Sequence, residues 1–445
     1  MHLPLAAALL LLLETALVGP AAAQPRQAAG ELLVKYREGV SEAEIAGIHA
    51  ASGARVLGLI EELGIYRLAV PARRSLGNEI QSYTNDPRCE RVTPNYMGRG
   101  GDFFPNDTSF GSAWHLNNTG QTGGSTDADV DTVEGWDVTR GDSSIVVAVL
   151  DTGIDSDHPE FLGRILAGFD FVNGDSDPEA DHSHGPQVTG ILAANADNLF
   201  GVAGVDHFAK ILPVKVLNSV NVGTTFDLMN GITYAANEGA NVINMSLIDY
   251  PLGVGFLEDA LQFAIDAGAT LIACAGNGGI GDANLSGPGA SPRTISVGWT
   301  TNTDARSGLS GTGSALDIVA PGSGIRTIVW NTPADLTTSF SGCSAATPVV
   351  SGIVSLLLAT DPSLTHDEVR QILTLTADDQ VGPSWEDTPG RDDFFGHGRV
   401  NMDRALRRDF GPPASMPTLA GGALVFLVLS LLAAGCLMLA RGVRV

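Results

Sequence analysis

Three short stretches of this chain carry the side-chain types that nucleophilic catalysis needs. Asp151 follows the apolar run 145–150, which has the pattern of a buried strand, so its carboxylate would stand at the strand's carboxyl end. His184 opens a run of small residues typical of a helix, and Ser344 precedes the apolar run 349–359, also typical of a helix. A histidine can take the proton of a serine hydroxyl that attacks a carbonyl carbon, and a carboxylate can orient the imidazole. The three stretches therefore predict acyl transfer through a serine nucleophile.

The elements that must position these residues have the pattern of an α/β fold. Apolar runs short enough to be strands buried on both faces occur at 145–150, 211–217, 241–247, 270–274 and 294–297. Amphipathic stretches such as 225–239 and 256–268 lie between them and end on Gly, as helices do. Repeated β-α-β units give a mostly parallel sheet covered by helices, and ligands bind beyond the carboxyl ends of its strands.

The three stretches also have neighbours that resemble the motifs of a known family. Residues 151–154 read Asp-Thr-Gly-Ile, residues 184–190 read His-Gly-Pro-Gln-Val-Thr-Gly, and residues 342–348 read Gly-Cys-Ser-Ala-Ala-Thr-Pro. In this order they resemble the Asp, His and Ser motifs of the subtilases, which are serine endopeptidases. The resemblance extends over about residues 110–404. It implies a subtilisin-like α/β fold and the hydrolysis of peptide bonds in polypeptide substrates.

The resemblance implies that Asp151, His184 and Ser344 form a catalytic triad. Taken singly, Asp151 could be a turn former, His184 a surface imidazole and Ser344 a helix cap. Their occurrence together, in the order of the family, favours the catalytic interpretation. His182 is the alternative histidine, but the Gly of the family motif directly follows His184.

Further residues gain roles from the same resemblance. Residues 275–278 read Ala-Gly-Asn-Gly, which matches a family motif in which Asn277 donates a hydrogen bond to the oxyanion beside the Ser344 amide. A loop residue is the alternative role for Asn277. The family's substrate-binding segments correspond to Ser246, Leu247, Ile248 and Gly276. Ile248 stands where the family usually has Gly, and this adds bulk at the first specificity pocket.

Other positions also depart from the family motifs. Cys343 and Pro186 replace Thr, Thr189 replaces Ala, and Ala345 replaces Met. Cys343 is nearest to the chemistry and could alter the position of the nucleophile. Together with Ile248, it supports an alternative function, a catalytically weakened subtilase fold kept as a surface binding protein.

The chain has only four cysteines, too few for a disulfide scaffold. Cys89 lies in the N-terminal region and Cys436 in the C-terminal apolar segment, which leaves Cys274 and Cys343 in the main domain. We expect these two to be separate buried thiols, because buried unpaired cysteine is common. A disulfide between them in an oxidising compartment is the alternative.

The N-terminal region has the organisation of an exported precursor. Residues 1–23 hold an apolar run and end on Ala-Ala-Ala, which predicts a signal peptide, with a buried helix as the alternative. Residues 24–97 have the pattern of a small α+β unit and resemble the inhibitory propeptide of subtilases. Residues 98–112 begin with a Gly-rich polar stretch that we expect to contain the self-cleavage site, before the catalytic domain at 113–408.

The C-terminal region predicts attachment to a membrane or to the cell surface. A linker, 409–418, precedes the uncharged apolar segment 419–440 and the basic tail 441–445. The apolar segment has the length of a transmembrane helix, and the basic residues after it place the catalytic domain outside the cell. It also resembles a bacterial sorting signal, which is removed after export. The sequence leaves a permanent anchor and a removable signal as alternatives.

The charge of the chain bears on its partners. A formal net charge of -25 repels phosphate backbones, so we expect no nucleic-acid partner. The resemblance implies no cofactor for catalysis but a structural calcium ion held by an alternating acidic loop: Asp170, Asn173, Asp175, Asp177 and Glu179. Glu160 and Asp197 correspond to another calcium site of the family. An acidic, solvated loop is the alternative.

Overall fold

The computed structural model divides the chain into two units, Met1–Gly101 and Asp102–Val445. The described residues are 27–71, 76–96, 102–251, 255–284 and 286–410. Several predicted segments lie outside them: the signal peptide, residues 98–101 of the cleavage region, most of the C-terminal linker, the apolar segment 419–440 and the basic tail.

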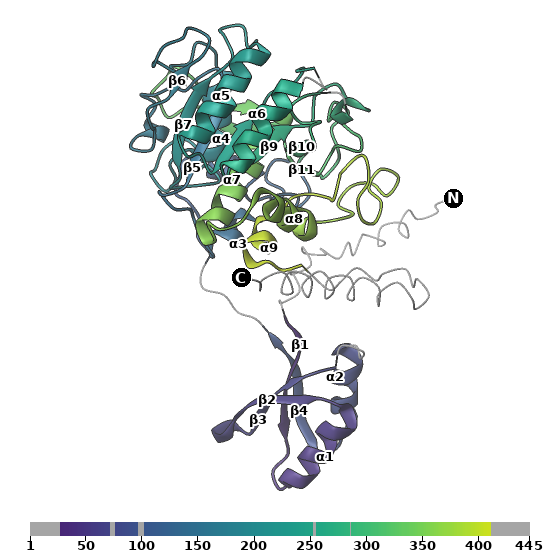
Figure 1. The fold of residues 1–445 in the computed structure, drawn as a ribbon. Helices are drawn as coiled ribbons and strands as arrows, with labels where there is room; N and C mark the ends of the chain where they lie inside the picture. Colours follow the sequence, from purple (N-terminus) through teal and green to yellow (C-terminus); the bar gives the residue numbers. More distant parts are fainter. Residues whose placement is uncertain (1–26, 72–75, 97–101, 252–254, 285, 411–445) are drawn as a thin grey trace, which may run out of the picture. The chain divides into compact units, whose positions relative to one another are not determined.

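The N-terminal unit is a four-stranded antiparallel sheet with two helices (Figure 1). Its elements are β1 (Gln27–Tyr36), α1 (Glu42–Ser52), β2 (Arg55–Ile60), η1 (Glu61–Leu63), β3 (Ile65–Ala69), α2 (Leu76–Asn85) and β4 (Cys89–Tyr96), with the strand order β2-β3-β1-β4. A capping box between Ser41 and Glu44 begins α1. The predicted α+β unit is therefore confirmed.

The larger unit contains a seven-stranded parallel sheet with the order β11-β10-β9-β8-β5-β7-β6. The strands are β5 (Val146–Asp151), β6 (Phe169–Asp170), β7 (Lys210–Lys215), β8 (Val242–Met245), β9 (Thr270–Cys274), β10 (Ile295–Thr300) and β11 (Ile318–Pro321). A separate antiparallel pair is formed by β12 (Ile325–Ile328) and β13 (Thr337–Phe340). The chain adds strands on one side of β5 and then on the other, so the topological switch lies beside this strand.

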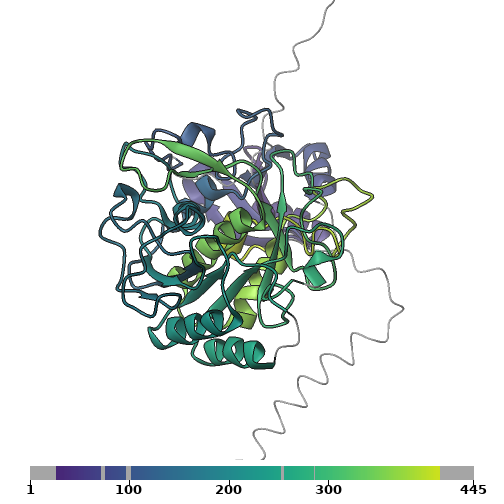
Figure 2. The same cartoon turned by 90° about the horizontal axis from the view of Figure 1, so that it is seen from above.

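Helices cover both faces of the parallel sheet (Figures 1 and 2). The helices are α3 (Thr132–Trp136), α4 (His184–Ala193), α5 (Thr225–Asn237), α6 (Gly255–Asp266), α7 (Cys343–Thr360), α8 (His366–Thr376) and α9 (Met402–Arg407), with short 3-10 turns η2 (Phe110–Ser112), η3 (Pro159–Phe161) and η4 (Asp282–Asn284). Alternate residues of β5 pack against the helices on opposite faces of the sheet. Val147 and Val149 pack with α4 and α7, whereas Ala148 and Leu150 pack with α5 and α6. The predicted α/β fold is confirmed.

Helix α7 runs through the middle of the larger unit (Figure 2). Among the described residues, α7 is the helix that is long and apolar enough to cross a membrane, and 89% of its length is buried inside the unit. It is therefore a core helix, and it fixes the position of the residues at its N-terminus.

Candidate active site

The three predicted catalytic residues lie at the ends of elements that meet at the carboxyl edge of the sheet. Asp151 is the last residue of β5, His184 is the first of α4, and Ser344 is the second of α7. Gly342 precedes α7 with a φ of 122°, a conformation that favours glycine, and an added Cβ there would lie 3.2 Å from Oδ1 of Asn277. The tight start of α7 brings Ser344 next to the segment that carries Asn277.

Asp151 and His184 form a short polar contact. Oδ1 of the fully buried Asp151 lies 2.7 Å from Nδ1 of His184 and also accepts the N–H of Thr152 at 2.7 Å. Burial alone would lower the pKa of His184, but the charge of Asp151 and this hydrogen bond outweigh it, so the pKa is raised above its ordinary value of 6.5. The ring of Phe340 meets the imidazole edge-on at 5.4 Å between centroids.

Ser344 is held against the end of β8. Its hydroxyl donates to the carbonyl oxygen of Ser246 at 3.2 Å, and the hydroxyl of Ser246 donates to the carbonyl oxygen of Ser344 at 3.2 Å. Ser344 and His184 line the same cleft, so the hydroxyl and the imidazole face one space. Contacts between catalytic groups are often loose before the substrate binds.

The Asn277 carboxamide has a fixed orientation. Its Oδ1 accepts the N–H of Cys343 at 3.0 Å, which leaves the Nδ2 donor free to face another acceptor. Asn277 lines the cleft with His184 and Ser344. The cleft has a volume of about 520 Å³, and its other walls come from the loop after β7, the segment after β8 and the end of β13. This arrangement places a hydroxyl, an imidazole and a carboxamide around one space.

Comparisons with known proteins identify the family. Residues 142–398 match the model of the subtilase family, and residues 18–95 match that of the fervidolysin N-terminal prodomain. The chain belongs to the subtilase family.

This subtilase is similar to several named proteases. It is 32% identical over 379 residues to the thermophilic serine proteinase of Bacillus sp. strain AK1, covering 85% of this chain and 87% of that protein. It is 36% identical over 274 residues to thermitase of Thermoactinomyces vulgaris, covering 62% and 92% of the two chains. A solved protease structure from Pseudoalteromonas arctica superimposes with a TM-score of 0.60 at 26% identity, covering 68% and 99%. The family and these relatives make the chain a serine endopeptidase with an N-terminal prodomain.

The cysteines of this subtilase correct one prediction. Cys274, the last residue of β9, and Cys343, the first of α7, form a disulfide, so the expectation of two separate thiols is wrong. The fold brings their Cα atoms to 5.2 Å, a usual distance for a disulfide, although 69 positions separate them in the chain. Cys89 in the N-terminal unit is a free, buried thiol.

The predicted substrate-binding residues are only partly brought together. Ser246, Leu247 and Ile248 follow β8 and line the cleft, whereas Gly276 is buried and lies outside its lining. Tyr250 also lines the cleft; its hydroxyl is buried and has no hydrogen-bond partner among the described residues. Sequence reasoning missed Tyr250 because no motif includes it.

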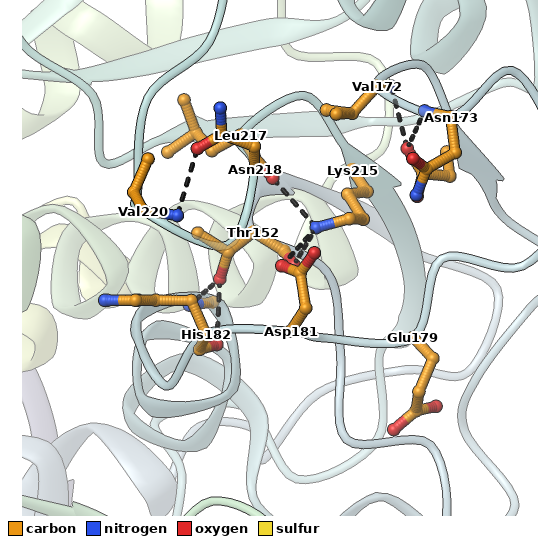
Figure 3. A network of polar contacts seen from close by, with 12 residues as sticks. Thr152, Val172, Asn173, Glu179, Asp181, His182, Lys215, Leu217, Asn218 and Val220 are labelled. Atoms are coloured by element: carbon orange, nitrogen blue, oxygen red, sulfur yellow. Dashed lines mark hydrogen bonds and ion pairs between the residues drawn. The ribbon is translucent and has the colours of Figure 1, made fainter.

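A buried lysine that sequence reasoning also missed connects the elements around the site (Figure 3). The side chain of Lys215 is 1% exposed, and its ammonium donates to the carbonyl oxygen of Thr152 at 3.0 Å and to Asp181 at 2.6 Å. The Thr152 hydroxyl donates to the carbonyl oxygen of His182 at 3.1 Å. His182 thus contributes its backbone to this network, while the ring that meets Asp151 is that of His184.

The acidic loop 170–179, where the sequence predicts calcium, is bonded to nearby backbone groups. Asp170 accepts the N–H groups of Val172 and Asn173. The other acidic side chains of the loop also accept backbone N–H groups: Asp175, Asp177 and Glu179. In the described part of the chain, no group of three or more acidic, histidine or cysteine side chains is arranged to hold a metal ion. Calcium at this loop stays a prediction.

The region of Glu160 and Asp197, where the sequence predicts a second calcium site, contains buried carboxylates. Glu160 is fully buried, and burial, together with the charge of nearby carboxylates such as Asp107, raises its pKa to about 8. Oδ2 of Asp107 accepts the N–H of Asp197 at 2.7 Å. Oδ1 of Asp107 is buried and has no partner among the described residues. Sequence reasoning missed Asp107, which has no motif and lies 90 positions from Asp197.

Proposed function

We propose that this subtilase cuts polypeptides with Asp151, His184 and Ser344 as its triad, and that it matures by cutting its own prodomain away. The observation that supports this most directly is the 2.7 Å contact between Asp151 and His184 in the cleft that Ser344 and Asn277 also line. The alternative roles of a turn former, a surface histidine and a helix cap do not explain why these three residues lie around one cleft.

Each group has a role that follows from its surroundings. The Nδ1–H of His184 donates to Asp151, which leaves Nε2 to take the Ser344 proton as Oγ bonds to the substrate carbonyl carbon. His184 then gives this proton to the leaving amine as the C–N bond breaks. Water next attacks the carbonyl carbon of the acyl-enzyme and gives a proton to His184. The C–O bond to Ser344 then breaks, His184 returns the proton to Oγ, and the acid is released.

The oxyanion formed in this reaction needs donors that already point at it. Nδ2 of Asn277 is one, because Oδ1 is held by the N–H of Cys343. The N–H of Ser344 is the second, since the first N–H groups of a helix have no partner inside the helix.

Ser344→Ala tests this proposal. The variant precursor should keep its prodomain, whereas the wild type should release it between Tyr96 and Asp102, as mass spectrometry of the purified proteins would show. Normal processing of Ser344→Ala would mean that another protease does the work. Reaction of wild-type Ser344 with a fluorophosphonate tests activation directly, and an unreactive serine would favour the binding-protein alternative, which the named relatives do not favour.

We also propose that the enzyme is exported and held at the cell surface through residues 419–440. Support comes from the sequence of this segment and from a relative named as a cell wall-associated protease in Bacillus subtilis, 37% identical over 323 residues and covering 68% of this chain and 35% of that protein. Deleting residues 419–445 should move the activity from the cell fraction to the medium.

Calcium, held by Asp107 and Glu160 with Asp197 nearby, would neutralise buried carboxylates without taking part in catalysis.

A further inference from the structure

The two segments that carry the proposed oxyanion donors come from distant parts of the chain. One segment follows β9 and contains Asn277, and the other opens α7 and contains Ser344. Oxyanion stabilisation depends on donors fixed before the reaction, and small displacements of such groups are costly. What holds the two segments together therefore matters for the reaction rate.

In the described part of the chain, a covalent bond and a hydrogen bond join these segments. The hydrogen bond runs from the Cys343 N–H to Oδ1 of Asn277. The covalent bond is the Cys274–Cys343 disulfide, whose half-cystines stand three positions before Asn277 and one position before Ser344. A hydrogen bond can lengthen with thermal motion, but the disulfide limits how far the two backbones separate.

The disulfide does not itself reach the substrate. Both half-cystines are fully buried, and neither lines the cleft. The Ser246–Ile248 segment, which lines the cleft, follows β8 and is joined to α7 by the two Ser246–Ser344 hydrogen bonds and not by the disulfide. An effect of the disulfide on catalysis must therefore pass through Asn277 and Ser344.

We propose that the Cys274–Cys343 disulfide is a positioning element of the oxyanion site, which holds the Asn277 carboxamide and the Ser344 amide at the spacing that the transition state requires. This inference rests on the proposed function. Cys274 and Cys343 are positioning residues in this scheme. Their loss should lower kcat and leave KM nearly unchanged, because the affected contacts form only in the transition state.

The test compares kcat and KM of the mature wild type and Cys274→Ala/Cys343→Ala, at a temperature well below the unfolding midpoint of both. Active-site titration with a fluorophosphonate gives the concentration of competent enzyme. We expect kcat to fall by about tenfold or more, with KM changed by less than about threefold. A kcat within about twofold of the wild type overturns the inference. If the alanine variant does not fold, Cys274→Val/Cys343→Val keeps the buried volume and is held to the same criteria.

A double-mutant cycle with Asn277→Ala separates positioning from general damage. If the disulfide acts through Asn277, its removal from the Asn277→Ala variant should lower log kcat by less than half as much as its removal from the wild type. A decrease in log kcat that is half or more of the wild-type decrease overturns the inference. If Asn277→Ala alone leaves kcat unchanged, or if Ser344→Ala stays active, then the proposed function fails instead.

One further variant is a matched control. Val354→Ala removes buried volume from the middle of α7 and should lower Tm while kcat stays at the wild-type value. A fall in kcat for Val354→Ala equal to that of the disulfide variant would reduce the disulfide to a structural role and overturn the inference.

Discussion

Nδ1 of His184 lies 2.7 Å from Oδ1 of Asp151, and the carboxylate that makes this contact is fully buried. A buried negative charge beside an imidazole stabilises the imidazolium, and the hydrogen bond fixes which ring nitrogen is left to meet Ser344. The contact therefore sets both the pKa and the orientation of the His184 imidazole, the proposed base.

Asp151→Asn should change the rate and its pH dependence together. The rate should fall by about 10⁴-fold, because an amide does not hold the imidazole in the required tautomer. The acid limb of kcat/KM should also move to lower pH, since the charge that raises the His184 pKa is lost while the burial that lowers it remains. A pH series of kcat/KM checks this, and an acid limb that stays in place would mean that another group titrates.

Asn277→Ala should lower kcat by about 10²–10³-fold, a magnitude that comes from removal of one oxyanion donor in subtilisin, a relative of this chain. KM should change little, because the donor meets the oxyanion more strongly than the ground-state carbonyl. Steady-state kinetics on a peptide substrate measure both. A raised KM with an unchanged kcat would instead make Asn277 a substrate-binding residue.

The sequence predicts where the three proposed triad residues lie in the fold, because each stands at the boundary of a strongly patterned element. Asp151 ends an apolar strand and Ser344 opens an apolar helix, so local pattern already places them at one sheet edge. The Cys274–Cys343 disulfide depends on a distance in space that the spacing of 69 residues does not encode. The sequence also does not predict strand β2, because its residues are largely exposed and show no clear alternation of buried and exposed side chains.

Buried charges are the other part that sequence pattern does not reveal. Lys215 ends β7 with its ammonium bonded to oxygens of the neighbouring segments, and the charge of Asp107, from a loop far away in the chain, helps to raise the pKa of Glu160. Both contacts depend on tertiary packing, because a polar residue at the end of a strand or in a loop reads as exposed until its neighbours are known.

Ile248→Gly should widen the cleft and change specificity. Ile248 lines the cleft beside Ser246 and Leu247, and removing its side chain makes room for a larger substrate group. The ratio of kcat/KM for a substrate with Phe before the cleaved bond to one with Ala there should rise by about tenfold or more. The exposed residue Ile280, outside the cleft lining, supplies the control Ile280→Gly. An unchanged ratio would show that Ile248 does not border this part of the substrate.

Calcium should stabilise the enzyme, and the chain allows its two candidate sites to be told apart. Adding a chelator should lower Tm, because buried carboxylates such as Asp107 and Glu160 lose their counter-charge. Glu160→Gln should abolish this dependence on chelator if calcium lies there. Asp177→Asn should abolish it if the loop 170–179 holds the ion. An unchanged wild-type Tm in chelator would remove calcium from both sites.

Asp131 should make the enzyme less stable at alkaline pH. Burial, followed by the charges of Asp129 and Asp378, raises the pKa of Asp131 from 3.8 to about 8. In the folded state Asp131 keeps its proton up to about pH 8, whereas in the unfolded state it releases the proton above pH 3.8. The stability that this group contributes is therefore complete below pH 3.8 and is lost as the pH rises through about 8. Asp131→Asn keeps the shape but carries no titrating proton, and its Tm should fall less on going from neutral to alkaline pH. Thermal unfolding of fluorophosphonate-blocked enzyme measures this without self-digestion, with the exposed Asp137→Asn as the matched control. Parallel Tm curves for the wild type and Asp131→Asn would show that the group which titrates in this range lies elsewhere.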